Sequence, residues 1–178
     1  MVRCANFVHH ERVVPGVSLY RDYESTEAFT AGVIGLPGAR TFFLQIGDAG
    51  DLLTIKCEKE QISALAVFLR KTLEDAPAVS PGSLRNSPFV EPDDAAFALG
   101  SVGLAYDRRD DHLILQFEEI SPEDDPEFDA SRVRVRITRA QAVAFCEHAD
   151  RLVRAGRPPC AFCGLPMNRD GHACPKMN

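Results

Sequence analysis

The sequence predicts an α+β fold with two βββα pseudo-repeats, which form an antiparallel sheet with helices packed on it. A small zinc-ribbon-like knuckle follows at the C-terminal end. Three observations predict this architecture: a pattern of segments that occurs twice, a hydrophobic period that changes from strand-like to helix-like within each copy, and a Cys/His group near the C-terminus. A length of 178 residues suits one domain with a small appendage.

The repeat is visible in three matched sets of residues. Phe29-Thr-Ala-Gly32-Val-Ile-Gly35-Leu36 occurs again as Phe97-Ala-Leu-Gly100-Ser-Val-Gly103-Leu104, and Leu44-Gln45-Ile46 occurs again as Leu115-Gln116-Phe117. The third set is Leu53, Ile55, Cys57 and Gln61, matched by Val133, Val135, Ile137 and Gln141. Because all three sets keep their order, we prefer duplication to chance likeness of two hairpin-plus-helix segments.

Repeat one, residues 29–75, is expected to hold three strands and a helix. Strands near 29–35 and 40–46 are joined by Leu36-Pro37-Gly38-Ala39, which suits a type II turn. A third strand is predicted near 52–58 from alternating apolar residues. A helix near 59–75 follows, with Ile62, Leu65, Ala66, Leu69 and Leu73 on one face.

A proline-rich linker, residues 76–95, leads to repeat two, residues 96–155. Here strands are predicted near 97–106 and 112–119, and a third carries Val133, Val135 and Ile137. Thr138 and Gln141 form a capping box that opens a helix near 139–155. The duplicated domain therefore spans 21–156, and residues 1–20 are expected to form a flexible N-terminal extension.

Composition and charge restrict the class of protein. With 45% hydrophobic and 26% charged residues, the chain is neither disordered nor membrane-spanning, and it shows no secretory signal. We expect a cytoplasmic location. The net charge of −6 is uneven, because residues 151–178 hold five cations and one acid, for a net +4. A basic end could contact an anionic partner, or it could simply face solvent.

The C-terminal segment 157–178 contains the pattern C-x2-C-x8-H-x-C, formed by Cys160, Cys163, His172 and Cys174. Three thiolates and one imidazole suit Zn²⁺, and four protein ligands leave no open position, so a structural site is predicted. The spacing matches no common iron–sulfur pattern. A disulfide or unrelated thiols are the alternative, which a reducing compartment and the added histidine disfavour.

Three segments resemble the actinobacterial family catalogued as domain of unknown function 3090: 29–45, 58–65 and above all 156–175. The resemblance covers about residues 21–178. It implies that Cys160, Cys163, His172 and Cys174 are metal ligands in the family, and it implies no catalytic residue. Residues 1–16 depart from the family pattern, so the native chain is expected to start nearer Val17.

The leading functional hypothesis is a non-enzymatic module that presents the zinc knuckle to a protein partner. Nucleic acid is an alternative partner, bound through Arg151, Arg154 and Arg157, although only Phe162 could stack on a base there. A second hypothesis is an enzyme for a small metabolite, with a pocket between the repeats that includes residues such as Arg40, Gln45, Gln116 or Asp111. A redox switch that ejects zinc is the third.

Overall fold

The computed structural model describes residues 18–48, 50–74, 76, 79, 87–122, 125, 127–156, 160–165, 167 and 171–177. Most of the expected N-terminal extension, including Val17, lies outside these residues. So do Arg157 and nine of the twenty residues of the expected linker.

The described chain forms a seven-stranded sheet and two helices. The strands are β1 (Tyr20–Tyr23), β2 (Ala28–Ile34), β3 (Thr41–Asp48), β4 (Asp51–Cys57), β5 (Phe97–Asp107), β6 (His112–Glu119) and β7 (Arg132–Thr138). The helices are α1 (Lys59–Leu73) and α2 (Arg139–Arg154). The strand order across the sheet is β1-β7-β6-β5-β4-β3-β2. The α+β class is confirmed, and the order β2-β3-β4-α1 followed by β5-β6-β7-α2 matches the predicted elements closely.

The sheet is mixed, whereas the sequence analysis predicted an antiparallel one. Pairing is antiparallel within β2-β3-β4 and within β5-β6-β7. The two halves join through a parallel contact between β4 and β5, and β1 adds to the outer edge of β7, also in parallel. A parallel neighbour requires a long crossover connection. Here α1 and the segment after it form that connection, and β5 begins opposite Ile55, near the end of β4.

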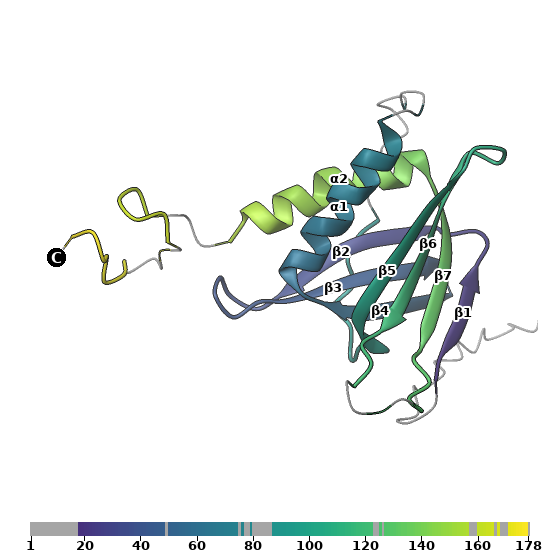
Figure 1. Cartoon of the computed structure of the whole chain (residues 1–178), viewed down its shortest axis with the longest axis horizontal. Coiled ribbons are helices and arrows are strands. Elements are labelled where there is room, and N and C mark those ends of the chain that lie inside the picture. Colours follow the sequence, from purple (N-terminus) through teal and green to yellow (C-terminus); the bar gives the residue numbers. More distant parts are fainter. Residues whose placement is uncertain are drawn as a thin grey trace, which may run out of the picture.

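Both helices cover the same face of the sheet (Figure 1). They bury one continuous core against the inward-facing residues of the strands, with Phe29, Phe117 and Phe145 grouped at its centre. The helix α2 also reaches the edge strand β2, where His148 Nε2 lies 2.9 Å from the carbonyl oxygen of Ala31. This contact covers part of a strand edge that would otherwise be open to pairing with another chain.

Two local predictions are confirmed: the turn at Leu36-Pro37-Gly38-Ala39 and the capping box that opens α2. Gly38 has φ 102° and Ala39 N–H donates to the Leu36 carbonyl at 2.9 Å, as the turn between β2 and β3 requires. In the second half, the register of β5 against β6 shifts between Leu99 and Ser101, so Gly100 marks a bulge. Both helices begin with the capping box formed by a glutamine at the third helical position.

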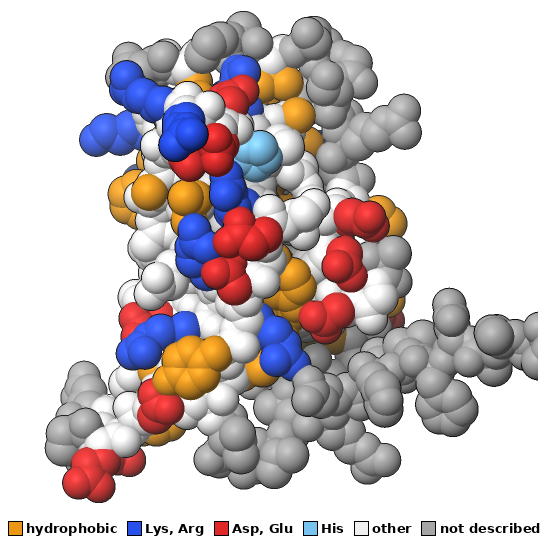
Figure 2. Space-filling model, turned by 90° about the vertical axis from the view of Figure 1, so that its right-hand side faces the viewer, with side chains coloured by type: hydrophobic (Ala, Val, Ile, Leu, Met, Phe, Trp, Pro, Cys, Tyr) orange, Lys and Arg blue, Asp and Glu red, His pale blue; other side chains and the backbone are white. Residues whose placement is uncertain are grey.

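The outer face of the sheet, away from the helices, differs between the two halves. Over β2 and β3 it is covered by the segment Ser87–Pro92, whose Phe89 ring lies on Gly32 and near Phe43. Over β6 and β7 it carries arginines paired with carboxylates, including Arg132 with Glu118. Figure 2 shows basic and acidic side chains interleaved on this side of the molecule. Within the described residues, neither helix is long and apolar enough to cross a membrane.

Candidate metal centre

The four predicted ligands come together in the C-terminal segment. Cys160 Sγ, Cys163 Sγ, Cys174 Sγ and a ring nitrogen of His172 all lie within 4.8 Å of one another. Cys160 and Cys174 are buried, while Cys163 and His172 are partly exposed. Figure 1 shows this segment beyond the C-terminal end of α2, at the opposite end of the molecule from β1.

Tight backbone turns bring the two sulfurs of the first pair to one side. Gly164 N–H donates to the Cys160 carbonyl at 2.9 Å, and Cys160 N–H donates to the Leu165 carbonyl at 2.8 Å. Gly164 has φ 76°, a conformation that glycine adopts without strain. Gly171, just before the histidine ligand, also has a positive φ, of 89°. The glycines in the motif therefore shape the two loops that carry the ligands.

Two distances inside the cluster are close to those of a tetrahedral zinc site. Zn–S bonds of about 2.3 Å and Zn–N bonds of about 2.1 Å separate two sulfurs by about 3.8 Å, and a sulfur and a nitrogen by about 3.6 Å. Cys160 Sγ and Cys174 Sγ are 3.9 Å apart, and Cys163 Sγ is 3.5 Å from His172 Nε2. Bonded disulfide sulfurs would be separated by about 2.0 Å. All three cysteines are free thiols at distances that suit a shared ion.

The local electrostatics favour one thiolate in particular. Backbone N–H groups of Cys163 and Phe162, together with the His172 side chain, lower the pKa of Cys160 to about 6. Burial raises the pKa of Cys163, and the neighbouring sulfurs raise it further. Several thiolates this close repel one another unless a cation lies between them. The arrangement therefore suits a positively charged ion.

The end of α2, which the segment follows, is held by the first half of the chain. Arg40, the residue before β3, donates to the carbonyl oxygens of Leu152 and Ala155 at the end of α2. Carbonyl groups in the last turn of a helix lack intrahelical partners, and a cation there also interacts favourably with the helix dipole. Arg40 thus fixes the point from which the chain leaves α2 toward the cysteines.

The four residues suggested for an enzymatic pocket lie at separate places. Arg40 bonds to the end of α2, and Gln45 is buried beneath the Ser87–Pro92 segment. Gln116 is exposed on the outer face of β6. Asp111 lies in the turn between β5 and β6, where it pairs with Arg139 at 2.7 Å. The structure does not bring these side chains together.

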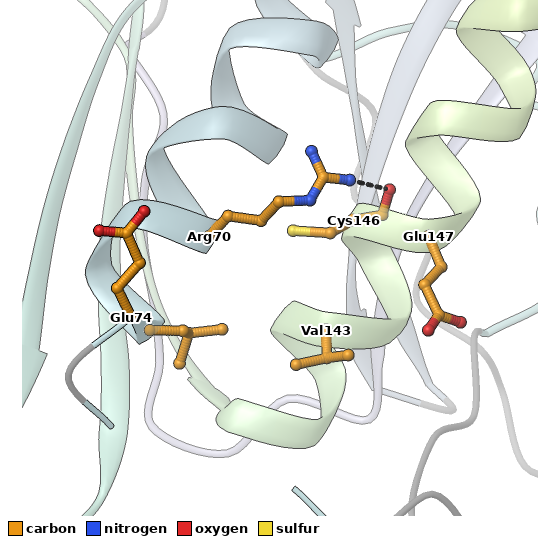
Figure 3. A pocket seen from close by; sticks show the side chains of 6 residues that line it. Arg70, Glu74, Val143, Cys146 and Glu147 are labelled. Atoms are coloured by element: carbon orange, nitrogen blue, oxygen red, sulfur yellow. Dashed lines mark hydrogen bonds between the residues drawn. The ribbon is translucent and has the colours of Figure 1, made fainter. Parts of the chain in front are cut away.

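A hollow of about 280 Å³ does lie between the helices, lined by Arg70, Leu73, Glu74, Val143, Cys146 and Glu147 (Figure 3). Among the side chains that line this hollow, the Cys146 thiol is the candidate nucleophile. Burial raises the pKa of that thiol to about 11, so it stays protonated at neutral pH. Arg70 donates a hydrogen bond to the Cys146 carbonyl at 3.0 Å and forms an ion pair with Asp150 at 2.8 Å. These contacts hold the helices together and present no activated nucleophile.

Sequence reasoning missed the contacts that Phe89 and Val90 make on the outer face. They fall in a proline-rich stretch, which we expected to be an exposed linker. The signal that could have indicated these contacts was the pair of adjacent apolar residues, Phe89 and Val90, between Pro88 and Pro92. The strand β1 was also missed, because Tyr20–Tyr23 shows no alternation of apolar and polar residues.

Comparisons with known proteins give one finding. The family model described as "Protein of unknown function (DUF3090)" matches residues 21–174, which include Cys160, Cys163, His172 and Cys174. No match was found among curated proteins or among solved structures.

Proposed function

Since the chain belongs to the DUF3090 family, whose description assigns no activity, we propose a function from its own residues. The protein is a non-enzymatic interaction module whose C-terminal Cys₃His cluster holds a structural zinc ion in a zinc-ribbon-like knuckle. The observation that carries this proposal is the convergence of four donor atoms at distances suited to one tetrahedral ion. Four protein ligands fill the coordination sphere, so the ion's role is to hold the segment in shape.

The knuckle depends on such an ion because it has little apolar packing of its own. The main core contains residues of the sheet and the two helices, and none of its described members lies beyond Val153. Metal binding worth on the order of 10 kcal/mol could organise a segment this short. Thiolate ligands also persist best under reducing conditions, which supports the proposed cytoplasmic location.

A protein is the proposed partner. Phe162, Leu165 and Met177 are 62%, 50% and 67% exposed, and all three lie in or beside the loops that carry the ligands. All three side chains face solvent. Exposed apolar side chains on a rigid knuckle suit a protein surface better than a phosphate backbone.

Nucleic acid remains the alternative partner, supported by the exposure of Arg151 and Arg154 on the last turn of α2. Arg157, the third arginine of this group, lies outside the described residues. Binding through these side chains would weaken steeply as salt is added, whereas binding through the apolar side chains would not.

Metal analysis of the purified protein tests the zinc site. We expect one equivalent of zinc per chain, and less than about a tenth of that in a Cys160→Ser/Cys163→Ser variant, since two thiolates are lost. Cys146→Ala is the matched control, because it removes a cysteine far from the cluster and should leave the metal content unchanged. Full-length protein with no zinc, or a double variant that keeps it, would contradict the proposal.

Comparative capture tests the interaction. Proteins retained by the wild-type chain but not by the zinc-free double variant would be partners of the knuckle. Phe162→Ser, which should keep the zinc, separates the two roles of the segment: loss of the same partners with full metal content assigns the contact to the exposed side chain. Identical partners for all three proteins would mean that the zinc site only stabilises the segment and that the knuckle does not bind a partner.

We also propose that the two βββα units are true pseudo-repeats. Gln45 and Gln116 each occupy the fifth position of an eight-residue strand, between buried apolar neighbours. Gln61 and Gln141 each complete the capping box of the following helix. These correspondences are what descent from one duplicated unit would leave.

A further inference from the structure

One long strand edge inside the sheet has no partner strand. β5 has 11 residues, but its parallel contact with β4 ends at Ala98. At the next residue, Gln61 of α1 donates a hydrogen bond from Nε2 to the Leu99 carbonyl at 2.9 Å. Over the stretch Ser101–Asp107, which we call the free edge, β5 pairs with β6 on one side and with no described strand on the other. A row of backbone groups is therefore available to a further strand.

The free edge lacks the protection that the two outermost edges of the sheet have. Proteins usually keep an edge strand short, charged, interrupted by proline or covered, because an open edge pairs with other chains. β1 has only four residues, two of them charged, and β2 lies against α2. The stretch Ser101–Tyr106, which follows the bulge at Gly100, contains neither a charged residue nor a proline. Four of its residues are exposed: Ser101, Val102, Gly103 and Ala105.

Apolar side chains border the free edge on the face that carries the helices. Val102 is 38% exposed there, although its partner on β6, Phe117, is buried. α1 contacts β5 and runs beside it (Figure 1). Phe68 of α1 lies two helical turns beyond Gln61, on the same side of the helix, and is 59% exposed. A strand added to β5 would remove part of this apolar surface from water.

The two ends of the free edge carry opposite charges. The turn that follows β5 holds Arg108 and Arg109, which are exposed and form no ion pair with any residue that the structure describes. The carboxylates of that turn are themselves paired with arginines of β7 and α2. At the other end, Glu58 and Glu60 are exposed beside Gln61, where the contact between α1 and β5 begins. An added strand is therefore favoured when a basic group lies at this acidic end.

We propose that the free edge pairs with the free edge of a second copy of this chain, antiparallel, about a two-fold axis at Leu104. Because this residue is the middle of the free edge, the register uses its whole length. Val102 then lies opposite Tyr106 of the second copy, a β-branched and aromatic pair of the kind that stabilises sheets. On the outer face, Gly103 lies opposite Ala105, and both are small.

The charges favour a second copy over a strand of another protein. In an antiparallel pair, the basic turn of each copy lies at the acidic end of the other, so the favourable contact forms twice by symmetry. A foreign strand would have to carry the same order of charges, whereas the second copy always does. This contact is separate from the knuckle, and it does not depend on zinc.

Sedimentation velocity of the full-length chain at several concentrations tests the pairing. We expect a reversible monomer–dimer equilibrium for the wild type. Val102→Lys should raise the dimer dissociation constant by about tenfold or more, because it places a charge between the two strands. Leu52→Lys is the matched control: Leu52 is 39% exposed on β4, away from the free edge, so this variant should dimerise as the wild type does.

A charge exchange tests the antiparallel orientation. Arg108→Glu changes an exposed turn residue, and it should weaken the dimer by about fivefold, since two symmetric ion pairs are lost. Adding Glu60→Arg to this variant should restore most of the loss. Hydrogen–deuterium exchange locates the contact, because the backbone amides of Ser101–Asp107 should become better protected as the protein concentration rises.

Three outcomes would overturn the proposal. One is a chain that stays monomeric at millimolar concentration, and another is a dimer that Val102→Lys and Arg108→Glu leave unchanged. The third is protection of the free edge that appears only when another protein is added, which would identify a foreign strand as the occupant.

Discussion

Asp111 closes the turn between β5 and β6, and it is the one described non-glycine residue with a positive φ, 56°. Its carboxylate accepts two hydrogen bonds from Arg139, at 2.7 and 2.8 Å, and one from Tyr106 at 2.6 Å. These contacts lower the pKa of Asp111 to about 2, with Arg139 the main cause. The hairpin tip is thereby tied to the first turn of α2.

The pH dependence of this contact has a definite sign. The pKa in the folded protein lies below the value near 3.9 of an unfolded aspartate, so the stabilisation is complete above about pH 4. It is lost as the pH falls through about 2. We expect Asp111→Asn to be less stable than the wild type at pH 7, with the difference in unfolding free energy vanishing near pH 2.

Urea denaturation at several pH values measures this difference, and NMR titration of the carboxyl carbon gives the pKa directly. Asparagine tolerates the positive φ, so the substitution tests the charge and not the backbone. Asp93→Asn, which removes the same charge from the segment before β5, should show no such pH-dependent gap. A stability difference at Asp111 that persists unchanged at pH 2 would contradict the role of the ion pair.

At the scale of elements, the Ser87–Pro92 segment depends on a glycine in β2. A Cβ at Gly32 would lie 2.0 Å from the Phe89 ring, which is closer than any real contact. Gly32→Ala should therefore displace the segment and cost about 1–3 kcal/mol of unfolding free energy, the usual range for overpacking. The amide of Val90, protected by Gln45 in the wild type, should exchange with solvent much faster.

Gly103→Ala is the matched control, since the added Cβ would meet Gln116 at an ordinary 3.7 Å. It should leave Val90 exchange unchanged, and hydrogen–deuterium exchange measures both variants. Equal Val90 protection in Gly32→Ala and wild type would show that the ring finds another position without releasing the backbone.

The elements predicted from sequence were those whose pattern is local. Leu53, Ile55 and Cys57 alternate with other residues and so indicate a strand. Thr138 and Gln141 form the capping box of a helix, and Pro37-Gly38 form the turn of a hairpin. Each of these elements could be predicted from a few neighbouring residues. The Cys/His cluster was predictable for the same reason, since the spacing C-x2-C is itself local.

The contacts that were missed join residues far apart in the chain. β1 pairs with β7 through Tyr20 and Arg132, which are more than a hundred residues apart, and no periodicity within Tyr20–Tyr23 signals that pairing. The parallel contact between β4 and β5 rests on two register pairs, Ile55 with Phe97 and Lys56 with Ala98. Such contacts depend on the assembled sheet, and the sequence of either strand alone does not contain them.

At the scale of the whole molecule, the sheet and the knuckle should respond differently to loss of metal. The core is formed by sheet and helix residues, whereas the shape of the knuckle rests on four ligands and a few backbone bonds. If the cluster holds the proposed zinc ion, a strong chelator should release that ion and unfold the knuckle alone. The Tm of the body should change by less than about 2 °C, because few of its contacts are lost.

Two-dimensional NMR before and after chelation measures this difference. Amide signals of the knuckle should move to random-coil positions, while those of Leu115 and Val135 in the sheet stay in place. Addition of zinc should restore the original spectrum. Collapse of the whole spectrum on chelation would show that the ion also supports the body.

The bond between His148 and Ala31 has a consequence for synthesis on the ribosome. Its two residues are 117 positions apart, so β2 is made long before the helix that covers its edge. Until α2 emerges, the nascent chain presents a strand with unpaired backbone groups, the kind of surface on which chains aggregate. The edge of β2 is thus covered only after α2 has been made, and slow synthesis or truncation ahead of α2 would leave the first-made half without this cover.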